Sequence, residues 1–244
     1  MLKETRTDIM HRLQKEILPL QGIRAALNDT VLDDALGPIK HAFQTASFPL
    51  GAIHEFIATG SEDAAATGGF VGGLLSCLMR NNGVAIWVSA CRTIFPPALK
   101  LLGIAPDKMI FIDLKKENQI LWAMEEALKC NGLSAVIGEM QDLSFTASRR
   151  LQLAVEQSQV TGFVVRRNPR KLEANACVTR WKITSLPSEA ADALPGVGFP
   201  RWKVELLKVR NGKPAIWEVE WAAGHFEHVA ISKAIVVELQ KKVG

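Results

Sequence analysis

LGAIHEFIATGSEDAAAT, residues 50–67, is the most informative stretch of this sequence. Residues 50–58 predict a turn followed by a short strand, and an apolar helical pattern begins around Phe70. A phosphate-binding loop has the same strand–loop–helix order, with the pattern G-x-x-x-x-G-K-[ST] between strand and helix. The stretch therefore predicts the frame of a nucleotide-binding site. An ordinary loop followed by a tight helix start is the alternative interpretation.

The residues that would bind phosphate are missing from this frame. Gly60 takes the place of the first glycine, and Thr67 takes the place of the hydroxyl residue. Ala65 stands where the second glycine belongs, and Ala66 stands where the lysine belongs. We therefore interpret residues 60–67 as a degenerate nucleotide loop.

Two acidic side chains make nucleotide binding still less favourable. Glu62 and Asp63 place negative charge where a polyphosphate would lie. Two like charges about 4 Å apart repel one another by on the order of 1 kcal/mol even in water. The sequence therefore predicts no working ATP site, no cofactor and no catalytic residue.

The rest of the chain alternates between short apolar runs and helical patterns. Residues 84–89 form a continuous apolar run, which is typical of a strand buried on both faces of a parallel sheet. The expected strands are 53–58, 84–89, 109–113, 134–138 and 162–165, and the expected helices are 70–80, 96–102, 117–129 and 146–157. This alternation predicts an α/β fold with a mostly parallel central sheet flanked by helices.

The pattern changes after Asn175, where β-rich segments follow one another without helices. Asn211-Gly212 is a strong hairpin turn signal and predicts an antiparallel β end to the sheet. The strands expected in this region are 177–186, 202–210 and 215–221. The chain is thereby divided into an N-terminal helical appendage, a core with its antiparallel β extension, and a C-terminal tail: residues 1–47, 48–228 and 229–244.

The composition is that of an ordinary globular protein. The chain has 244 residues, of which 48% are hydrophobic and 22% are charged. It lacks the run of about 18 apolar residues that would predict a membrane span. Its four cysteines are widely spaced, without a Cys-x-x-Cys pair, which favours a reduced, cytoplasmic protein over a disulfide framework or a zinc site. We expect no bound metal.

Positive charge is concentrated in one part of the chain. Residues 149–213 contain 13 basic and 5 acidic residues, whereas the whole chain has a net charge of only +4. A basic surface of this kind suits nucleic acid or an acidic partner. A solvated loop is the alternative interpretation. The candidate binding residues lie around the last expected parallel strand: Arg149, Arg150, Arg166, Arg167, Arg170 and Lys171.

The order of elements resembles the RecA-like core, in which a P-loop frame and further alternating strands precede an antiparallel end. More closely, residues 38–221 resemble the ImuA family of degenerate RecA relatives, which act in damage-induced mutagenesis in bacteria. The residues that carry this resemblance are Phe48-Pro49-Leu50-Gly51-Ala52-Ile53-His54-Glu55, the frame Gly60–Thr67, Arg180-Trp181 and Arg201-Trp202.

The resemblance implies positions for the working groups of a RecA-type ATPase, and none of them carries the usual residue. Cys91 corresponds to the catalytic glutamate, Glu139 to the Mg²⁺-side aspartate and Arg166 to the polar switch residue. Phosphoryl transfer depends on positioning and on charge stabilisation by a lysine and a metal. The resemblance therefore implies a protein that is not an enzyme, with Glu139 as a buried, hydrogen-bonded carboxylate. A metal ligand is the alternative interpretation of Glu139.

The implied function is a non-catalytic adaptor in SOS-induced, error-prone translesion DNA repair. The implied partners are an ImuB-like polymerase relative and an error-prone DNA polymerase, with DNA contacted directly or through them. Residues 4–18 predict an amphipathic helix that docks on a partner, on another copy or on the protein's own core. Two alternatives stay open: an atypical RecA-family ATPase or recombinase paralogue, and a cell-division inhibitor of the SulA type.

Overall fold

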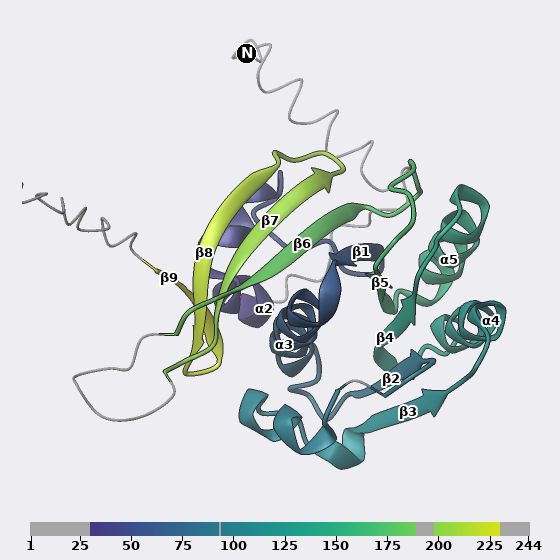
Figure 1. Cartoon of the computed structure of the whole chain (residues 1–244), viewed down its shortest axis with the longest axis horizontal. Coiled ribbons are helices and arrows are strands. Elements are labelled where there is room, and N and C mark those ends of the chain that lie inside the picture. The colour runs from purple at the N-terminus through teal and green to yellow at the C-terminus, as the bar shows by residue number, and fades with distance from the viewer. Residues whose placement is uncertain (1–29, 93, 189–197, 230–244) are drawn as a thin grey trace, which may run out of the picture.

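The computed structural model describes residues 30–92, 94–188 and 198–229. The helix predicted over 4–18 lies outside these residues, as does all but the first residue of the predicted C-terminal tail. One nine-stranded sheet runs through the described part of the chain, with helices against both of its faces (Figure 1).

The strand order across the sheet is β3-β2-β4-β5-β1-β6-β7-β8-β9. Neighbouring strands from β3 to β6 are parallel, and β7, β8 and β9 continue the sheet in antiparallel pairs. This architecture confirms the predicted RecA-like core with its antiparallel β end. The strands are β1 Ile53–Ala58, β2 Val84–Ser89, β3 Met109–Asp113, β4 Leu133–Met140, β5 Thr161–Arg167, β6 Thr179–Leu186, β7 Arg201–Val209, β8 Ala215–Ala222 and β9 His225–His228.

The two parts of the sheet bury their strands differently. Strand β1 is buried at every position, as expected for a parallel strand between two layers of helices. Strand β7 instead alternates: Trp202 and Val204 are buried, whereas Lys203 and Glu205 are partly exposed. This alternation is typical of an antiparallel strand with one solvated face.

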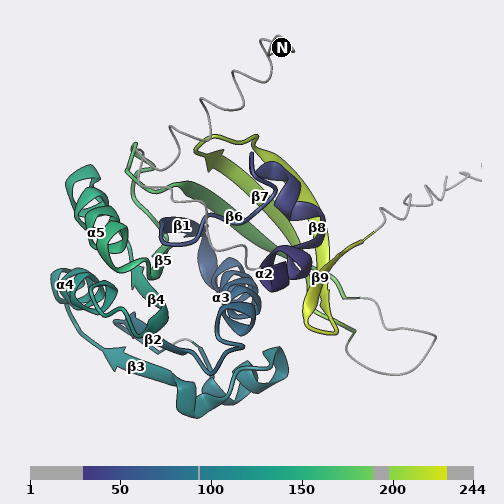
Figure 2. The same cartoon turned by 180° about the vertical axis from the view of Figure 1, so that it is seen from behind.

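Each face of the sheet has its own apolar core. One core contains residues of α2 (Thr30–Ala35), the 3-10 helix η1 (Gly37–Ala42) and α3 (Gly60–Leu78). The other contains residues of α4 (Glu117–Leu128) and α5 (Phe145–Ser158). Figure 2 shows α2 and α3 inside the curve of the sheet, away from α4 and α5. No helix in the described ranges is long and apolar enough to cross a membrane.

Aromatic side chains join α3 to the antiparallel part of the sheet. Trp181 of β6 stacks on Phe56 of β1, with their ring centroids 6.2 Å apart. Phe70 of α3 lies 4.7 Å from Phe226 of β9, and Trp202 of β7 meets Phe70 edge-on at 6.2 Å. The antiparallel end therefore shares one core with the parallel strands.

Two features near the ends of the described chain were not expected from the sequence. Strand β9 adds an edge to the sheet, and its Phe226 is buried. Residues 30–43 belong to the segment predicted as an appendage, and they pack against the core of the sheet. Leu36 and Ile39 are fully buried in this segment.

Candidate functional site

No loop separates the first strand from the helix that follows it. The sequence predicted a loop over 60–67 and a helix from about Phe70, but α3 begins at Gly60. Ala65, Ala66 and Thr67 are therefore helical. Consecutive alanines favour helix, and an alanine in place of the second glycine removes the freedom that a phosphate-binding turn requires.

The N-terminus of α3 is occupied by the protein's own side chains. The Thr59 backbone N–H and side-chain O–H both donate to Oδ2 of Asp63, at 3.3 and 2.5 Å. The Gly60 N–H donates to Oδ1 of Asn168 at 2.8 Å, from the loop after β5. Free N–H groups at a helix N-terminus are the donors that bind phosphate in nucleotide sites. Here Asp63 supplies a negative charge at the same place, and this charge would repel a phosphate.

The last two residues of the motif, Ala66 and Thr67, are buried inside the protein. Thr67 is fully buried, and its Oγ1 has no hydrogen-bond partner among the described residues. Ala66 is also buried in the core. The hydroxyl that would bind Mg²⁺ in a P-loop therefore points into the protein.

Glu139 lies at the carboxyl end of β4 and has protein partners. Its Oε1 accepts a hydrogen bond from Nε1 of Trp87 at 2.7 Å, and its Oε2 lies 3.4 Å from Nη1 of Arg167. Glu139 is a buried, hydrogen-bonded carboxylate, as the sequence predicted. Cys91, at the position of the catalytic glutamate, is exposed. Within the described ranges, no three His, Cys, Asp or Glu side chains lie close enough together to hold a metal ion.

Arg166 lies inside the protein and not on the basic surface that the sequence predicted. Its side chain is 2% exposed, and its Nη1 donates to Oε1 of Glu55 at 2.9 Å. The other oxygen of Glu55 accepts from Nδ2 of Asn175 at 2.7 Å and from Nε of Arg180 at 2.5 Å. Nη2 of Arg166 also donates to the backbone oxygen of Lys171 at 2.8 Å. Arg166 is therefore part of a buried charge cluster, and little of its side chain is left for contact with a partner.

The other predicted cations are at the surface, and the four arginines among them each lie near an acidic group. Arg170 is 75% exposed, and its Nε lies 3.7 Å from Asp142. Lys171 is exposed, and Arg167 is partly buried. On α5, Arg149 lies 3.5 Å from Glu156, and Arg150 lies 2.5 Å from Glu125 of α4. The structure gives no contact between the α5 arginines and the Arg170–Lys171 loop.

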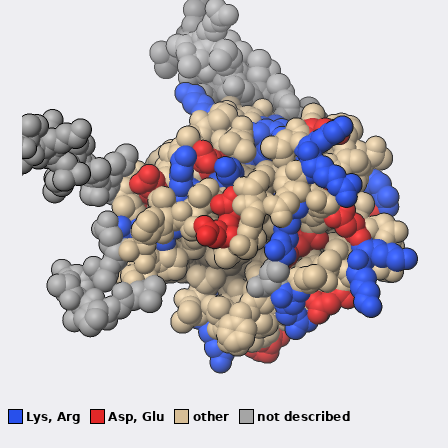
Figure 3. Space-filling view, viewed as in Figure 1, with Lys and Arg blue, Asp and Glu red and all other residues tan. Residues whose placement is uncertain are grey.

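The surface charges form a mixed pattern. Figure 3 shows basic side chains interspersed with acidic ones on the face that carries α4, α5 and the end of β5. A hollow of about 280 Å³ lies beside the N-terminus of α5, and both Arg170 and Lys171 line it together with Asp142 and Glu173. The predicted basic surface is therefore partly neutralised by its neighbours.

The fold and these contacts define a class of protein: a RecA-like α/β core in which the position of the phosphate site is filled by internal side chains. Protein ImuA from two strains of Caulobacter vibrioides is 34% identical to this chain over 203 residues, which cover 78% of this chain and 83% of that protein. The chain belongs to the ImuA family. No protein-family model matches it. Its membership confirms the resemblance seen in the sequence and indicates a role in damage-induced mutagenesis.

We expect isothermal titration with Mg-ATP or Mg-ADP to give no binding heat. The reason is that Asp63 and Asn168 already accept hydrogen bonds from the start of α3. The double variant Ala65→Gly with Ala66→Lys is also expected to bind no nucleotide, because it leaves both of these acceptors in place. A micromolar dissociation constant for the unaltered chain would contradict this prediction.

Proposed function

We propose that this protein is a non-catalytic adaptor in SOS-induced translesion DNA repair. One observation carries the proposal: Asp63 and Asn168 occupy the N-terminus of α3, where a RecA-type ATPase holds phosphate. The nine-stranded sheet and its surfaces are retained around this filled position. That combination supports a role as a binding scaffold.

The proposed partners are an ImuB-like polymerase relative and an error-prone DNA polymerase. Membership in the ImuA family supports a role in damage-induced mutagenesis. One experiment tests both the proposed partners and the proposed adaptor role. We expect this chain to co-purify with the polymerase relative, and a strain without its gene to lose mutations induced by ultraviolet damage. A deletion strain that still mutates normally after damage would rule out the proposed role.

A single substitution separates the adaptor from an atypical ATPase. Thr67→Val removes the hydroxyl of the motif and keeps the shape of the side chain. Because Oγ1 of Thr67 is buried without a hydrogen-bond partner in the described part of the chain, its loss should not lower stability. An adaptor carrying Thr67→Val restores damage-induced mutagenesis to the deletion strain, whereas an ATPase that uses this hydroxyl does not.

We also propose that the exposed cations contact DNA or an acidic partner, and we expect binding to single-stranded DNA to weaken steeply with salt. Each phosphate contact contributes about 0.7 to the slope of log affinity against log salt for single strands. Replacing Arg149, Arg150, Arg170 and Lys171 by glutamine should lower this slope without unfolding the protein. Exposed lysines outside this region, Lys100 and Lys115, provide the matched control. If the variant binds DNA and the partner as the unaltered protein does, the four cations are solvated surface residues without a binding role.

A further inference from the structure

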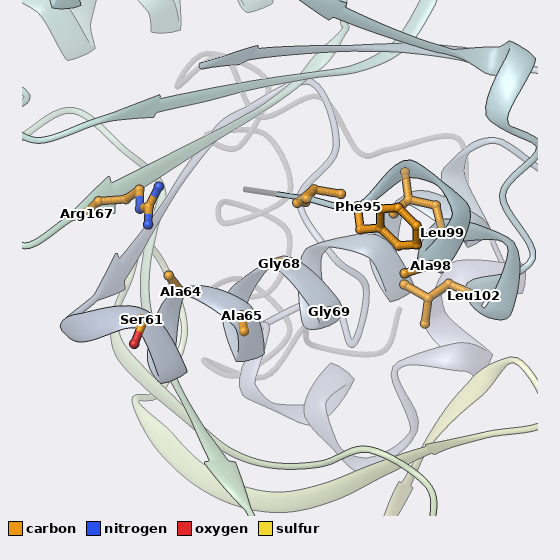
Figure 4. A pocket seen from close by; sticks show the side chains of 11 residues that line it. Ser61, Ala64, Ala65, Gly68, Gly69, Phe95, Ala98, Leu99, Leu102 and Arg167 are labelled. Carbon is orange, nitrogen blue, oxygen red and sulfur yellow. The ribbon is translucent and has the colours of Figure 1, made fainter. Parts of the chain in front are cut away.

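An apolar cavity of about 470 Å³ lies between α3 and the 3-10 helix η2 (Pro96–Leu102). Figure 4 shows the first turns of α3 on one side of it, the side chains of Phe95 and Leu99 on the other, and Arg167 at one end. The volume falls within the range of about 300–1,000 Å³ that is typical of ligand pockets. Of the residues described above, Ala65 and Arg167 line this cavity, whereas Asp63 and Asn168 do not.

The α3 side of the cavity has almost no side chains. Ala64, Ala65, Gly68 and Gly69 line it, so an occupant can approach the helix backbone closely. The two glycines differ in what surrounds them. A Cβ at Gly69 would lie 2.8 Å from the Trp202 ring, whereas a Cβ at Gly68 would meet only Ile94, at 3.4 Å. A side chain added at Gly68 would therefore project into the cavity at little cost to the core.

The opposite wall belongs to a segment that also exposes large apolar side chains to solvent. Phe95 is 68% exposed and Leu101 is 86% exposed, and Leu99 is the buried anchor of η2. Large apolar side chains that are exposed beside an apolar hollow mark interaction sites on soluble proteins. Because the apolar surface extends beyond the cavity, it suits an extended chain segment better than a small molecule.

Arg167 supplies the charge of the cavity. Its side chain is 34% exposed, and its contact with Glu139 joins Nη1 to Oε2 at 3.4 Å, which is long for a charged hydrogen bond. A guanidinium has five N–H donors, so this single contact leaves donors for a second carboxylate. Ser61 is the one other polar side chain in the lining. The chemistry is therefore an apolar hollow with a cation at one end.

We infer that this cavity binds a linear segment of a partner protein, with a bulky apolar side chain against Gly68 and a neighbouring carboxylate on Arg167. The inference rests on the proposed adaptor role and names the surface that serves it. Interfaces draw most of their affinity from a few large apolar anchors that fill desolvated pockets. The segment recognised here is apolar and acidic.

The first arm of the test uses 1-anilinonaphthalene-8-sulfonate, a dye with an aromatic body and one anionic group. We expect the native protein to bind it, with its fluorescence rising on titration. Gly68→Leu fills the cavity and should weaken dye affinity by about tenfold or more. Arg167→Gln should weaken it less, because only the ionic contact is lost. Gly132→Leu is the matched control, since Gly132 is exposed and has open space around its Cβ position.

The second arm asks whether the same variants keep the polymerase relative in a co-purification. Gly68→Leu should no longer co-purify with the polymerase relative, whereas Gly132→Leu should. If Gly68→Leu has a lowered melting temperature, Ala65→Leu takes its place in the test. Loss of the dye with full retention of the partner would overturn the inference, as would a native protein that binds no dye. If the unaltered chain does not co-purify with the polymerase relative, the proposed adaptor role is wrong, and so is the partner segment proposed for this cavity. Dye binding would still show whether the cavity can hold an apolar, anionic group.

Discussion

Replacing Arg166 by alanine is expected to lower the free energy of unfolding by about 3–5 kcal/mol, the usual cost of removing one partner from a buried ion pair. Arg166 is 2% exposed, and Glu55, its partner at 2.9 Å, is fully buried. Without the guanidinium, Glu55 keeps Asn175 and Arg180 but loses the charge that faces its Oε1. The carboxylate would then be buried with an uncompensated oxygen.

Urea denaturation followed by circular dichroism measures this change. Arg170→Ala is the matched control from the loop that follows the same strand, because Arg170 is largely exposed and a surface substitution of this kind stays within about 0.5 kcal/mol. Equal stabilities of the two variants would contradict the assignment of Arg166 to the buried cluster. DNA binding should follow the opposite order, with Arg170→Ala as the variant that weakens it.

The parallel strands could be predicted because a strand buried on both faces is a continuous apolar run. The bounds predicted for β1, β2 and β3 agree with the structure at both ends. The antiparallel end was predictable for a different reason: Asn211-Gly212 marks the hairpin, and Asn211 adopts the left-handed conformation (φ 56°) that such a turn requires. Both signals are local in the sequence.

The start predicted for α3 was wrong because the comparison with a phosphate-binding loop was given more weight than helix propensity. The local signals for a helix were present: three alanines in succession, and Asp63 placed to accept from Thr59 four residues earlier. Asn168, however, comes from 108 residues away and completes the N-terminus through the tertiary fold. No local pattern in the sequence indicates that contact.

The prediction that Arg166 lies on the surface was wrong for a related reason. Its partner Glu55 is 111 residues away, so nothing near Arg166 in the sequence shows that it is buried. A signal did exist on the other side of the pair, because Glu55, next to His54, interrupts an otherwise apolar strand. A carboxylate in a fully buried strand requires a partner, and an arginine at the end of a neighbouring strand is a natural candidate. The cavity beside α3 depends on where η2 packs and has no comparable signal.

His54 is the second group whose effect on stability should be large. It is fully buried in β1, and its Nε2 donates to the Pro49 carbonyl at 2.8 Å. Because a carbonyl can only accept, the proton is on Nε2, and Nδ1 accepts from the Thr179 hydroxyl at 2.8 Å. Nε1 of Trp181 in turn donates to that hydroxyl at 2.6 Å. The network therefore uses the neutral form of the imidazole.

Burial lowers the pKa of His54 to about 3, although the hydrogen bond to Pro49 opposes this shift. Between an ordinary pKa of about 6.5 and this value, the unfolded chain binds a proton that the folded chain does not. Stability is then unaffected by His54 above the unfolded pKa and falls as the pH drops below it, by about 1.4 kcal/mol per pH unit. Urea denaturation at a series of pH values from 7 to 5 should show a loss of about 2 kcal/mol from this residue.

The control for this prediction is a pair of glutamine substitutions. His54→Gln is expected to be less stable at neutral pH, because it breaks the network with Thr179, but to lose the part of the acid dependence that comes from His54. His41→Gln, at an exposed position, should keep the acid dependence of the unaltered protein. An acid dependence that His54→Gln leaves unchanged would assign the effect to other groups. It would also mean that the imidazole becomes charged in the folded protein despite its full burial.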